Sequence, residues 1–270
     1  MAKGNFEACA LVTLSYEGGY TKDKRDPGNW TGGKVGKGEL KGTNMGIAAN
    51  TYPHLDIKNL TKADVLPLYK ARYWDGIQGD ALPFGVDLVT YDYGVNSGPS
   101  RGVKALQRAV GAKVDGRMGG ETIKATARAA SDGKKVIQAV CSYRMSFLRG
   151  LTTWETFKRG WSSRVANVEA KGVAMWLTRG AGKIEATEKR ILSDEANKAG
   201  KVASNQKKAA SGAATGGGVI GMGDTVTTGE LNWMLFAVLA VAVLAVASVL
   251  IVKARQNRER EKAYFVAAHS

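Results

Sequence analysis

The chain opens with the stretch FEACALVTLSYEGGY, which spans residues 6–20. Up to Tyr16 this stretch is mostly apolar, and it predicts a buried first helix over residues 5–17. Two glycines follow, and one of them can take the left-handed conformation in which helices commonly end. Glu17 is therefore expected at the end of a buried helix, with its carboxyl group facing a cleft.

This position suits an acid that must hold its proton. Apolar surroundings disfavour an ionised carboxyl group, and cleavage of a glycosidic bond needs a proton donor for the leaving oxygen. Asp26 is the candidate for the second carboxylate, with an Asx-turn before Pro27 as its alternative role. Thr43 is the candidate to hold the attacking water, with a hydroxyl bonded to the local backbone as its alternative. The catalytic candidates are thus Glu17, Asp26 and Thr43.

Aromatic and amide side chains are expected along the cleft, because sugar rings offer flat apolar faces and many hydroxyl groups. Trp74 has the core of the domain as its alternative place. Asp87 and Asp92 are alternative carboxylates, for which capping or solvated positions compete. His54 and His269 have no partners at ligand spacing, so neither a metal nor a cofactor is expected. The candidates for substrate binding are Tyr20, Trp30, Asn44, Tyr73, Trp74 and Asn96.

Several short motifs follow one another in order along the chain. They are EGGY (17–20), DPG (26–28), TNMGI (43–47), YW (73–74), FGVD (84–87), NSG (96–98), LQ (106–107), DG (115–116) with Gly119 and Thr122, and WETFKRGW (154–161). Together they resemble the phage-type N-acetylmuramidases of glycoside hydrolase family 108, over roughly the first two-thirds of the chain. The resemblance implies a helical lysozyme-like domain, Glu17 as the catalytic glutamate and a small peptidoglycan-binding module that ends near the last motif.

Residues 30–42 look like an insertion relative to that family. Either Thr31 or Thr43 can then take the place of the family's threonine. We favour Thr43, because Asn44, Gly46 and Ile47 accompany it.

The predicted fold class is all-α, with a small irregular or β-hairpin segment near Glu17. Helices are expected over residues 61–73, 83–93, 100–110, 121–130, 134–151 and 161–177. The predicted domains are a muramidase domain (1–94), a helical peptidoglycan-binding-like module (95–178), a tether rich in Lys, Ala and Gly that has at most a solvated helix (179–230), a transmembrane helix (231–252) and a basic cytoplasmic tail (253–270).

The transmembrane prediction rests on an uncharged run of 22 residues, 231–252. As a helix it would span about 30 Å of hydrocarbon. Cations follow the run, whereas residues 216–232 carry no Lys or Arg. The positive-inside rule then predicts a single-pass protein of the inner membrane, with the enzyme domain on the periplasmic or wall side. Because the N-terminus has no signal-peptide pattern, a holin-like pore or a late insertion event would have to bring that domain across.

The formal net charge of +15 indicates attraction to polyanions such as nucleic acid, anionic lipid or an acidic wall, or else simple solubility. No helix-turn-helix, RNP or zinc pattern supports nucleic acid as a partner. Cys9 and Cys141 lie in apolar, helix-like contexts and are expected to be buried free thiols.

From the residues and the resemblance we predict an endolysin of the lysozyme type. It would cleave the MurNAc–GlcNAc β-1,4 bond of peptidoglycan by general acid catalysis, in lysis of the bacterial wall. The alternatives are a lytic transglycosylase and a non-catalytic membrane protein that binds peptidoglycan.

Overall fold

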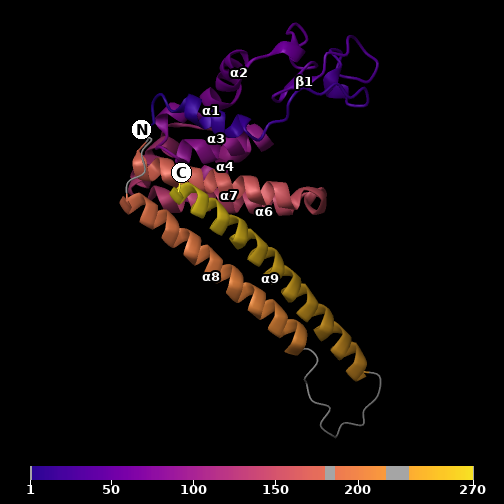
Figure 1. Cartoon of the computed structure of the whole chain (residues 1–270), viewed down its shortest axis with the longest axis vertical. Coiled ribbons are helices and arrows are strands. Elements are labelled where there is room, and N and C mark those ends of the chain that lie inside the picture. The colour runs from indigo at the N-terminus through magenta and orange to yellow at the C-terminus, as the bar shows by residue number, and fades with distance from the viewer. Residues whose placement is uncertain (1, 180–185, 217–230, 270) are drawn as a thin grey trace. The chain divides into compact units, whose positions relative to one another are not determined.

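The computed structural model describes residues 2–179, 186–216 and 231–269 (Figure 1). It is mostly helical with a small two-stranded sheet, which confirms the α-rich fold with a short hairpin. The chain divides into two compact units. The first comprises residues 1–150 and 175–182, and the second comprises residues 151–174 and 183–270.

The first unit holds the shorter helices and the sheet. Its α-helices are α1 (Phe6–Leu14), α2 (Lys62–Tyr69), α3 (Val86–Ser97), α4 (Pro99–Val110), α5 (Gly120–Arg128) and α6 (Gly133–Arg149). The strands β1 (Thr43–Asn44) and β2 (Ile47–Ala48) pair antiparallel. Short helical turns connect these elements: η1 (Pro27–Asn29), η2 (Ile57–Asn59), the π-helical η3 (Lys70–Trp74), η4 (Asp75–Ile77), η5 (Gly79–Ala81) and η6 (Ala130–Asp132).

Helix α3 is the centre of this unit, because its residues 86–94 are all buried. Helices α1, α4 and α6 pack against it. Gly102 lets the backbone of α4 come close, since a Cβ there would lie only 2.5 Å from the carbonyl oxygen of Thr90. A buried ion pair joins α3 to α6, with Arg144 Nη1 2.6 Å from Asp92 Oδ2.

The predicted helix over residues 61–73 forms in two parts, α2 and the π-helical turn η3. Thr61 opens it with a capping box, as its backbone N–H donates to Asp64 Oδ2 at 2.8 Å and its hydroxyl accepts from the backbone N–H of Asp64. Cys9 and Cys141 are buried free thiols, as predicted.

The second unit is built on long helices, α7 (Trp154–Thr178), α8 (Ala186–Gly216) and α9 (Leu231–His269); the last turn of α7, from Met175, belongs to the first unit. Helices α8 and α9 lie side by side (Figure 1). Their contact is lined by small side chains, so the backbones can approach closely. The buried residues include Leu192, Ala196, Ala199, Ala203 and Ala210 of α8 and Ala247 and Ala254 of α9.

Helix α8 falls within the region predicted as a tether. The prediction relied on the scarcity of large apolar side chains, but buried alanines are enough to pack one long helix against another. Residues 180–185 and 217–230 of that region lie outside the described residues.

Helix α9 contains the run 231–252 that was predicted to cross a membrane. Among the described residues, no helix is long and apolar enough to do so, and the transmembrane helix is therefore not supported. The side chains of residues 231–240 lie outside the described part of the chain. The predicted basic tail continues the same helix up to His269.

Candidate active site

Glu17 is half-buried and lies just beyond the end of α1. Its backbone N–H donates to the carbonyl of Leu14 at 3.2 Å. The expected left-handed glycine is not found, since neither Gly18 nor Gly19 has a positive φ. Tight i→i−3 hydrogen bonds already satisfy the last carbonyls of the helix, so its end needs no such residue. Both glycines are exposed, and a Cβ at either would meet nothing within 4 Å. A ligand can therefore approach the backbone beside Glu17.

The turn of the β1–β2 hairpin is fixed to the same segment. Met45 and Gly46 connect the strands and have φ values of 47° and 74°. Two consecutive residues with positive φ are typical of a two-residue type I′ turn, which Gly at the second position favours. The backbone N–H of Met45 donates to the carbonyl of Gly18 at 3.1 Å. The hairpin is thereby held against the chain that leaves Glu17.

At this turn the carboxyl group of Glu17 and the hydroxyl of Tyr69 converge. A Cβ on Gly46 would lie 3.4 Å from Glu17 Oε2 and 2.4 Å from Tyr69 Oη, so only glycine leaves room for both. The Tyr69 hydroxyl donates to the carbonyl of Met45 at 3.0 Å. The ring of Tyr73 follows, with its centroid 5.3 Å from that of Tyr69. Burial raises the pKa of the Tyr73 hydroxyl, against the opposing effect of the neighbouring Arg72 cation.

Thr43 pairs with the chain that follows Glu17. Thr21 and Thr43 exchange backbone hydrogen bonds of 2.8 and 2.9 Å. The hydroxyl of Thr43 donates to Asn29 Oδ1 at 2.7 Å, and the buried Asn29 amide donates to the carbonyl of Asp23 at 3.0 Å. Because its hydrogen points to Asn29, the Thr43 oxygen is left with lone pairs that can accept a hydrogen bond from a water molecule.

The insertion over residues 30–42 closes on itself. Trp30 pairs with Leu40, so the chain between them forms a loop and then returns. Thr31 lies inside this loop, where its hydroxyl accepts from the backbone N–H of Glu39 at 2.9 Å. This placement agrees with the choice of Thr43 over Thr31, although the catalytic role of Thr43 stays a prediction.

Asp26 is exposed and forms the Asx-turn that was its alternative role. Its Oδ1 accepts from the backbone N–H of Gly28 at 2.8 Å and opens η1. The turn uses one carboxylate oxygen and leaves the second oxygen for other contacts. A catalytic role for Asp26 therefore remains a prediction.

The alternative carboxylates on α3, Asp87 and Asp92, are both fully buried, so neither is solvated. Asp92 pairs with Arg144, and Asp87 accepts from Asn5 Nδ2 at 2.7 Å and from the backbone N–H of Leu88 at 2.7 Å. Burial raises the pKa of Asp87 to about 7, against the opposing effect of these hydrogen bonds. Such buried groups support the core and do not reach a polysaccharide.

Four of the six predicted sugar-binding residues have accessible side chains: Tyr20, Trp30, Tyr73 and Asn96. Tyr20 Oη donates to the carbonyl of Lys41 at 3.1 Å, and Trp30 Nε1 donates to the carbonyl of Lys24 at 2.9 Å. These bonds orient both rings, which is useful for stacking on a sugar.

The other two residues have structural positions. Trp74 is fully buried, with ring centroids 5.5 Å from Phe6 and 5.6 Å from Tyr91, so its ring belongs to the core. The buried side chain of Asn44 donates to the carbonyl of Ile57 at 3.1 Å and holds that turn against the hairpin. Neither side chain is exposed to a substrate.

A polar hollow of about 370 Å³ lies on the same unit. Tyr20 connects it to the Glu17 segment, and carboxylates and cations share its walls. It is lined by Tyr20, Lys22, Glu39, Leu40, Lys41, His54, Leu55, Asp56, Ile57 and Lys58. Apart from Tyr20, these residues were not predicted from the sequence. Tyr69 was also missed, although its spacing of four residues from Tyr73 on one helical run was a usable signal.

Comparison with known proteins found two matching family models and a similar solved structure. Residues 10–98 match the family model of glycosyl hydrolase 108, and residues 101–166 match that of a predicted peptidoglycan domain. The chain is similar to the solved structure of Brucella abortus SagA, with 36% sequence identity and a TM-score of 0.52. The similarity covers 63% of this chain and 95% of that one. No curated protein matches the chain.

The chain therefore belongs to the glycosyl hydrolase 108 family and carries a peptidoglycan-binding domain. It is a glycoside hydrolase whose substrate class is peptidoglycan. The family and the binding module predicted from the motifs are both confirmed.

Proposed function

We propose that the protein is an N-acetylmuramidase that cleaves the MurNAc–GlcNAc β-1,4 bond, with Glu17 as the general acid. The observation that carries this proposal is the position of Glu17, whose carboxyl group lies, like the Tyr69 hydroxyl, against the Gly46 turn while the backbone of Gly18 and Gly19 beside it stays open. The acid is thus partly withdrawn from water on one side and accessible on the other.

In the proposed reaction, the Glu17 carboxyl group gives its proton to the glycosidic oxygen as the bond from that oxygen to the anomeric carbon breaks. A water molecule adds to the anomeric carbon and gives up a proton. The Thr43 oxygen can accept a hydrogen bond from that water and orient it, because its own hydrogen is directed to Asn29. The second oxygen of Asp26 is the candidate acceptor for the released proton.

The substitution Glu17→Gln tests the acid, because an amide keeps the shape of the side chain but cannot supply the proton. General acid catalysis typically contributes about 10²- to 10⁴-fold to a rate. We expect clearance of purified wall material to fall by about this factor, with an unchanged circular dichroism spectrum. Glu7→Gln is the matched control, since Glu7 is an exposed residue of α1. Equal clearance by the Glu17 variant and this control would remove the assignment.

Mass analysis of the released muropeptides separates the related chemistries. Reducing-end muramic acid is the product expected of a muramidase. A 1,6-anhydro end would instead identify a lytic transglycosylase, in which no water adds. Binding to peptidoglycan without any released product would identify a non-catalytic binding protein.

We further propose that the enzyme acts on the wall side of the inner membrane in bacterial lysis, as a phage-type endolysin does. Support comes from the uncharged run 231–252. The described helices do not include one that spans a membrane, and Arg260 and Tyr264, which follow the run, contact Glu169 of α7. We therefore propose that the run attaches the enzyme to one face of the membrane without crossing it. Fractionation of cells that express the full chain, or a chain ending at residue 225, tests the attachment. We expect the full chain with the membranes and the shorter chain without them, and the same distribution of both would contradict it.

A further inference from the structure

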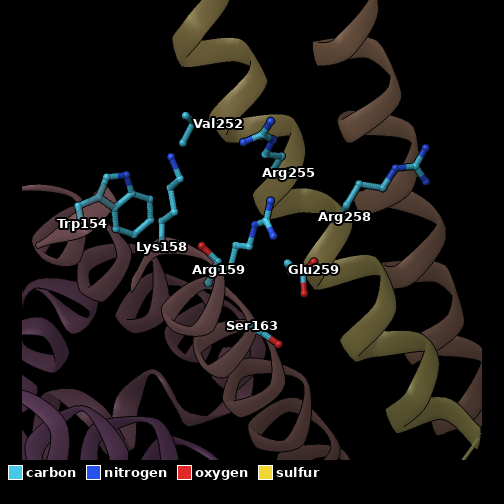
Figure 2. A pocket seen from close by; sticks show the side chains of 9 residues that line it. Trp154, Lys158, Arg159, Ser163, Val252, Arg255, Arg258 and Glu259 are labelled. Carbon is cyan, nitrogen blue, oxygen red and sulfur yellow. The ribbon is translucent and has the colours of Figure 1, made fainter. Parts of the chain in front are cut away.

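A second hollow, of about 450 Å³, lies between α7 and α9 in the second unit (Figure 2). Its lining is strongly basic, with four cationic side chains and one carboxylate. The lining residues are Trp154, Lys158, Arg159, Ser162, Ser163, Val252, Arg255, Arg258 and Glu259. Trp154, Lys158 and Arg159 belong to the WETFKRGW motif, but the muramidase chemistry does not account for a basic hollow that residues of α9 complete.

Three of the five charged groups have a partner of opposite sign on their own helix. Lys158 pairs with Glu155, Arg258 pairs with Glu261 at 2.7 Å, and Glu259 pairs with Lys262 at 3.4 Å. Figure 2 shows Arg258 pointing away from the hollow, which agrees with its ion pair.

Arg159 and Arg255 differ from these three, because neither forms an ion pair with any residue that the structure describes. Arg159 comes from α7 and Arg255 from α9, and both guanidinium groups lie in the space between the helices together with the amine of Lys158 (Figure 2). Like charges that face one another repel, and an anion placed between them would reverse that repulsion.

The two helices are held together farther along by a buried contact. Glu169 of α7 accepts hydrogen bonds from Arg260 Nη2 at 2.7 Å and from Tyr264 Oη at 2.9 Å, both on α9. Glu169 and Tyr264 are buried. This contact fixes the spacing of α7 and α9, so Arg159 and Arg255 are presented to a ligand without a rearrangement of the helices.

We propose that the hollow between α7 and α9 binds a phosphate group through Arg159 and Arg255. The guanidinium fork matches the oxygen geometry of phosphate and can donate two parallel hydrogen bonds. Lys158 adds a third cation, and Ser162 and Ser163 bring hydroxyl groups to the same wall. A carboxylate is a weaker match, because it offers fewer oxygens and one negative charge to two arginines.

The phosphate is either free or part of a lipid headgroup. Trp154 and Val252 give the hollow an apolar margin. On α9, Val249 and Ile251 precede Arg255 and are 53% and 42% exposed, so apolar surface continues from the basic hollow. An apolar stripe next to a phosphate site is the arrangement that would accept a phospholipid.

The test uses the full chain, titrated with inorganic phosphate by calorimetry, with chloride at matched ionic strength as the background. The pocket variant carries Arg159→Gln and Arg255→Gln. The control variant carries Arg190→Gln and Lys198→Gln, two exposed cations of α8, so both variants lose the same charge. We expect saturable binding to the unaltered chain and to the control, and affinity at least about tenfold weaker in the pocket variant, because charge-assisted bonds are lost. Equal affinity of the two variants, or no binding to the unaltered chain, would overturn the proposal.

A vesicle assay distinguishes the two sources of phosphate. The chains are sedimented with vesicles of phosphatidylglycerol, and with phosphatidylcholine vesicles as the background. Weaker recovery of the pocket variant than of the control on phosphatidylglycerol supports a lipid headgroup. Equal recovery, together with the loss of inorganic phosphate binding, supports free phosphate. Circular dichroism confirms folding of each variant, and Arg159→Gln alone replaces the double substitution if that variant is unfolded.

Discussion

Glu17 at the end of α1 and the aspartates of α3 are acidic residues of one unit with opposite surroundings. Glu17 is half-buried beside an exposed glycine pair, whereas Asp87 and Asp92 are fully buried and held by polar partners. A carboxyl group can take part in catalysis only where a substrate reaches it. Asp87 and Asp92 instead connect helices. Burial therefore distinguishes a carboxylate with a structural role from one that can take part in catalysis, which residue type alone does not do.

The largest effect on stability is expected from Arg144→Met. The substitution leaves Asp92 buried without its cation, and loss of one partner of a buried pair typically costs about 3–5 kcal/mol. Urea denaturation measures the free energy of unfolding. The double variant Asp92→Leu with Arg144→Met is the control, since it removes both charges and should be clearly more stable than Arg144→Met alone. If the single variant were the more stable one, the ion pair would not have the structural role that we assign to it.

Asp87 makes stability depend on pH in a predictable direction. Its pKa is raised from 3.8 to about 7 in the folded protein, so the folded state retains a proton that the unfolded state has lost between these values. Stability should therefore fall as pH rises from about 4 to about 7, at ~1.4 kcal/mol per pH unit at most. Asp87→Asn should remove the part of the pH dependence of the unfolding free energy that comes from Asp87. Unfolding free energies of both proteins at pH 5 and pH 8 measure it, and identical slopes would contradict the raised pKa.

Gly46→Ala should lower the rate of wall clearance as well as the free energy of unfolding. A methyl group there meets Tyr69 Oη and the Glu17 carboxyl group, and φ is +74°. Gly36→Ala is a matched control, because its φ is +78° and its Cβ would meet nothing within 4 Å. Both variants should lose about 1–2 kcal/mol of stability to the backbone conformation, and Gly46→Ala should lose more because its Cβ would lie 2.4 Å from Tyr69 Oη. We expect the rate of wall clearance to fall only for Gly46→Ala. Equal rates for the two variants would show that the Gly46 turn does not affect the function of Glu17.

The smallest effect is expected from Tyr69→Phe. It removes the hydrogen bond to the carbonyl of Met45, which is worth about 1 kcal/mol, and should reduce wall clearance a few-fold. Tyr91→Phe is the comparison, because the buried Tyr91 hydroxyl has no hydrogen-bond partner among the described residues. That variant should be as stable as the unaltered protein or more so. A larger loss of stability for Tyr91→Phe than for Tyr69→Phe would contradict this difference.

Much of the fold could be predicted from local patterns. Apolar periodicity placed α3, α4, α5 and α6 within a few residues, whereas α7 begins at Trp154, well before the predicted start at residue 161. The Thr61–Asp64 capping box marked the start of α2. The packing of α8 on α9 could not be predicted in this way, because alanine is common both in solvated helices and at close helix contacts. The interior position of Trp74 was weighed but not decided, since a large ring next to Tyr73 is compatible with either a core or a cleft.

The ordered motifs determined the family, the hairpin after Glu17 and the identity of the candidate acid, since each depends on residue type and spacing along the chain. Which groups surround that acid was decided by contacts between distant segments. Tyr69 Oη and Glu17 Oε2 can both lie against the Gly46 turn because it has no side chain, and Asp92 is neutralised by an arginine 52 residues away. Such contacts cannot be predicted from the spacing of residues along the chain, because they form only when the helices pack.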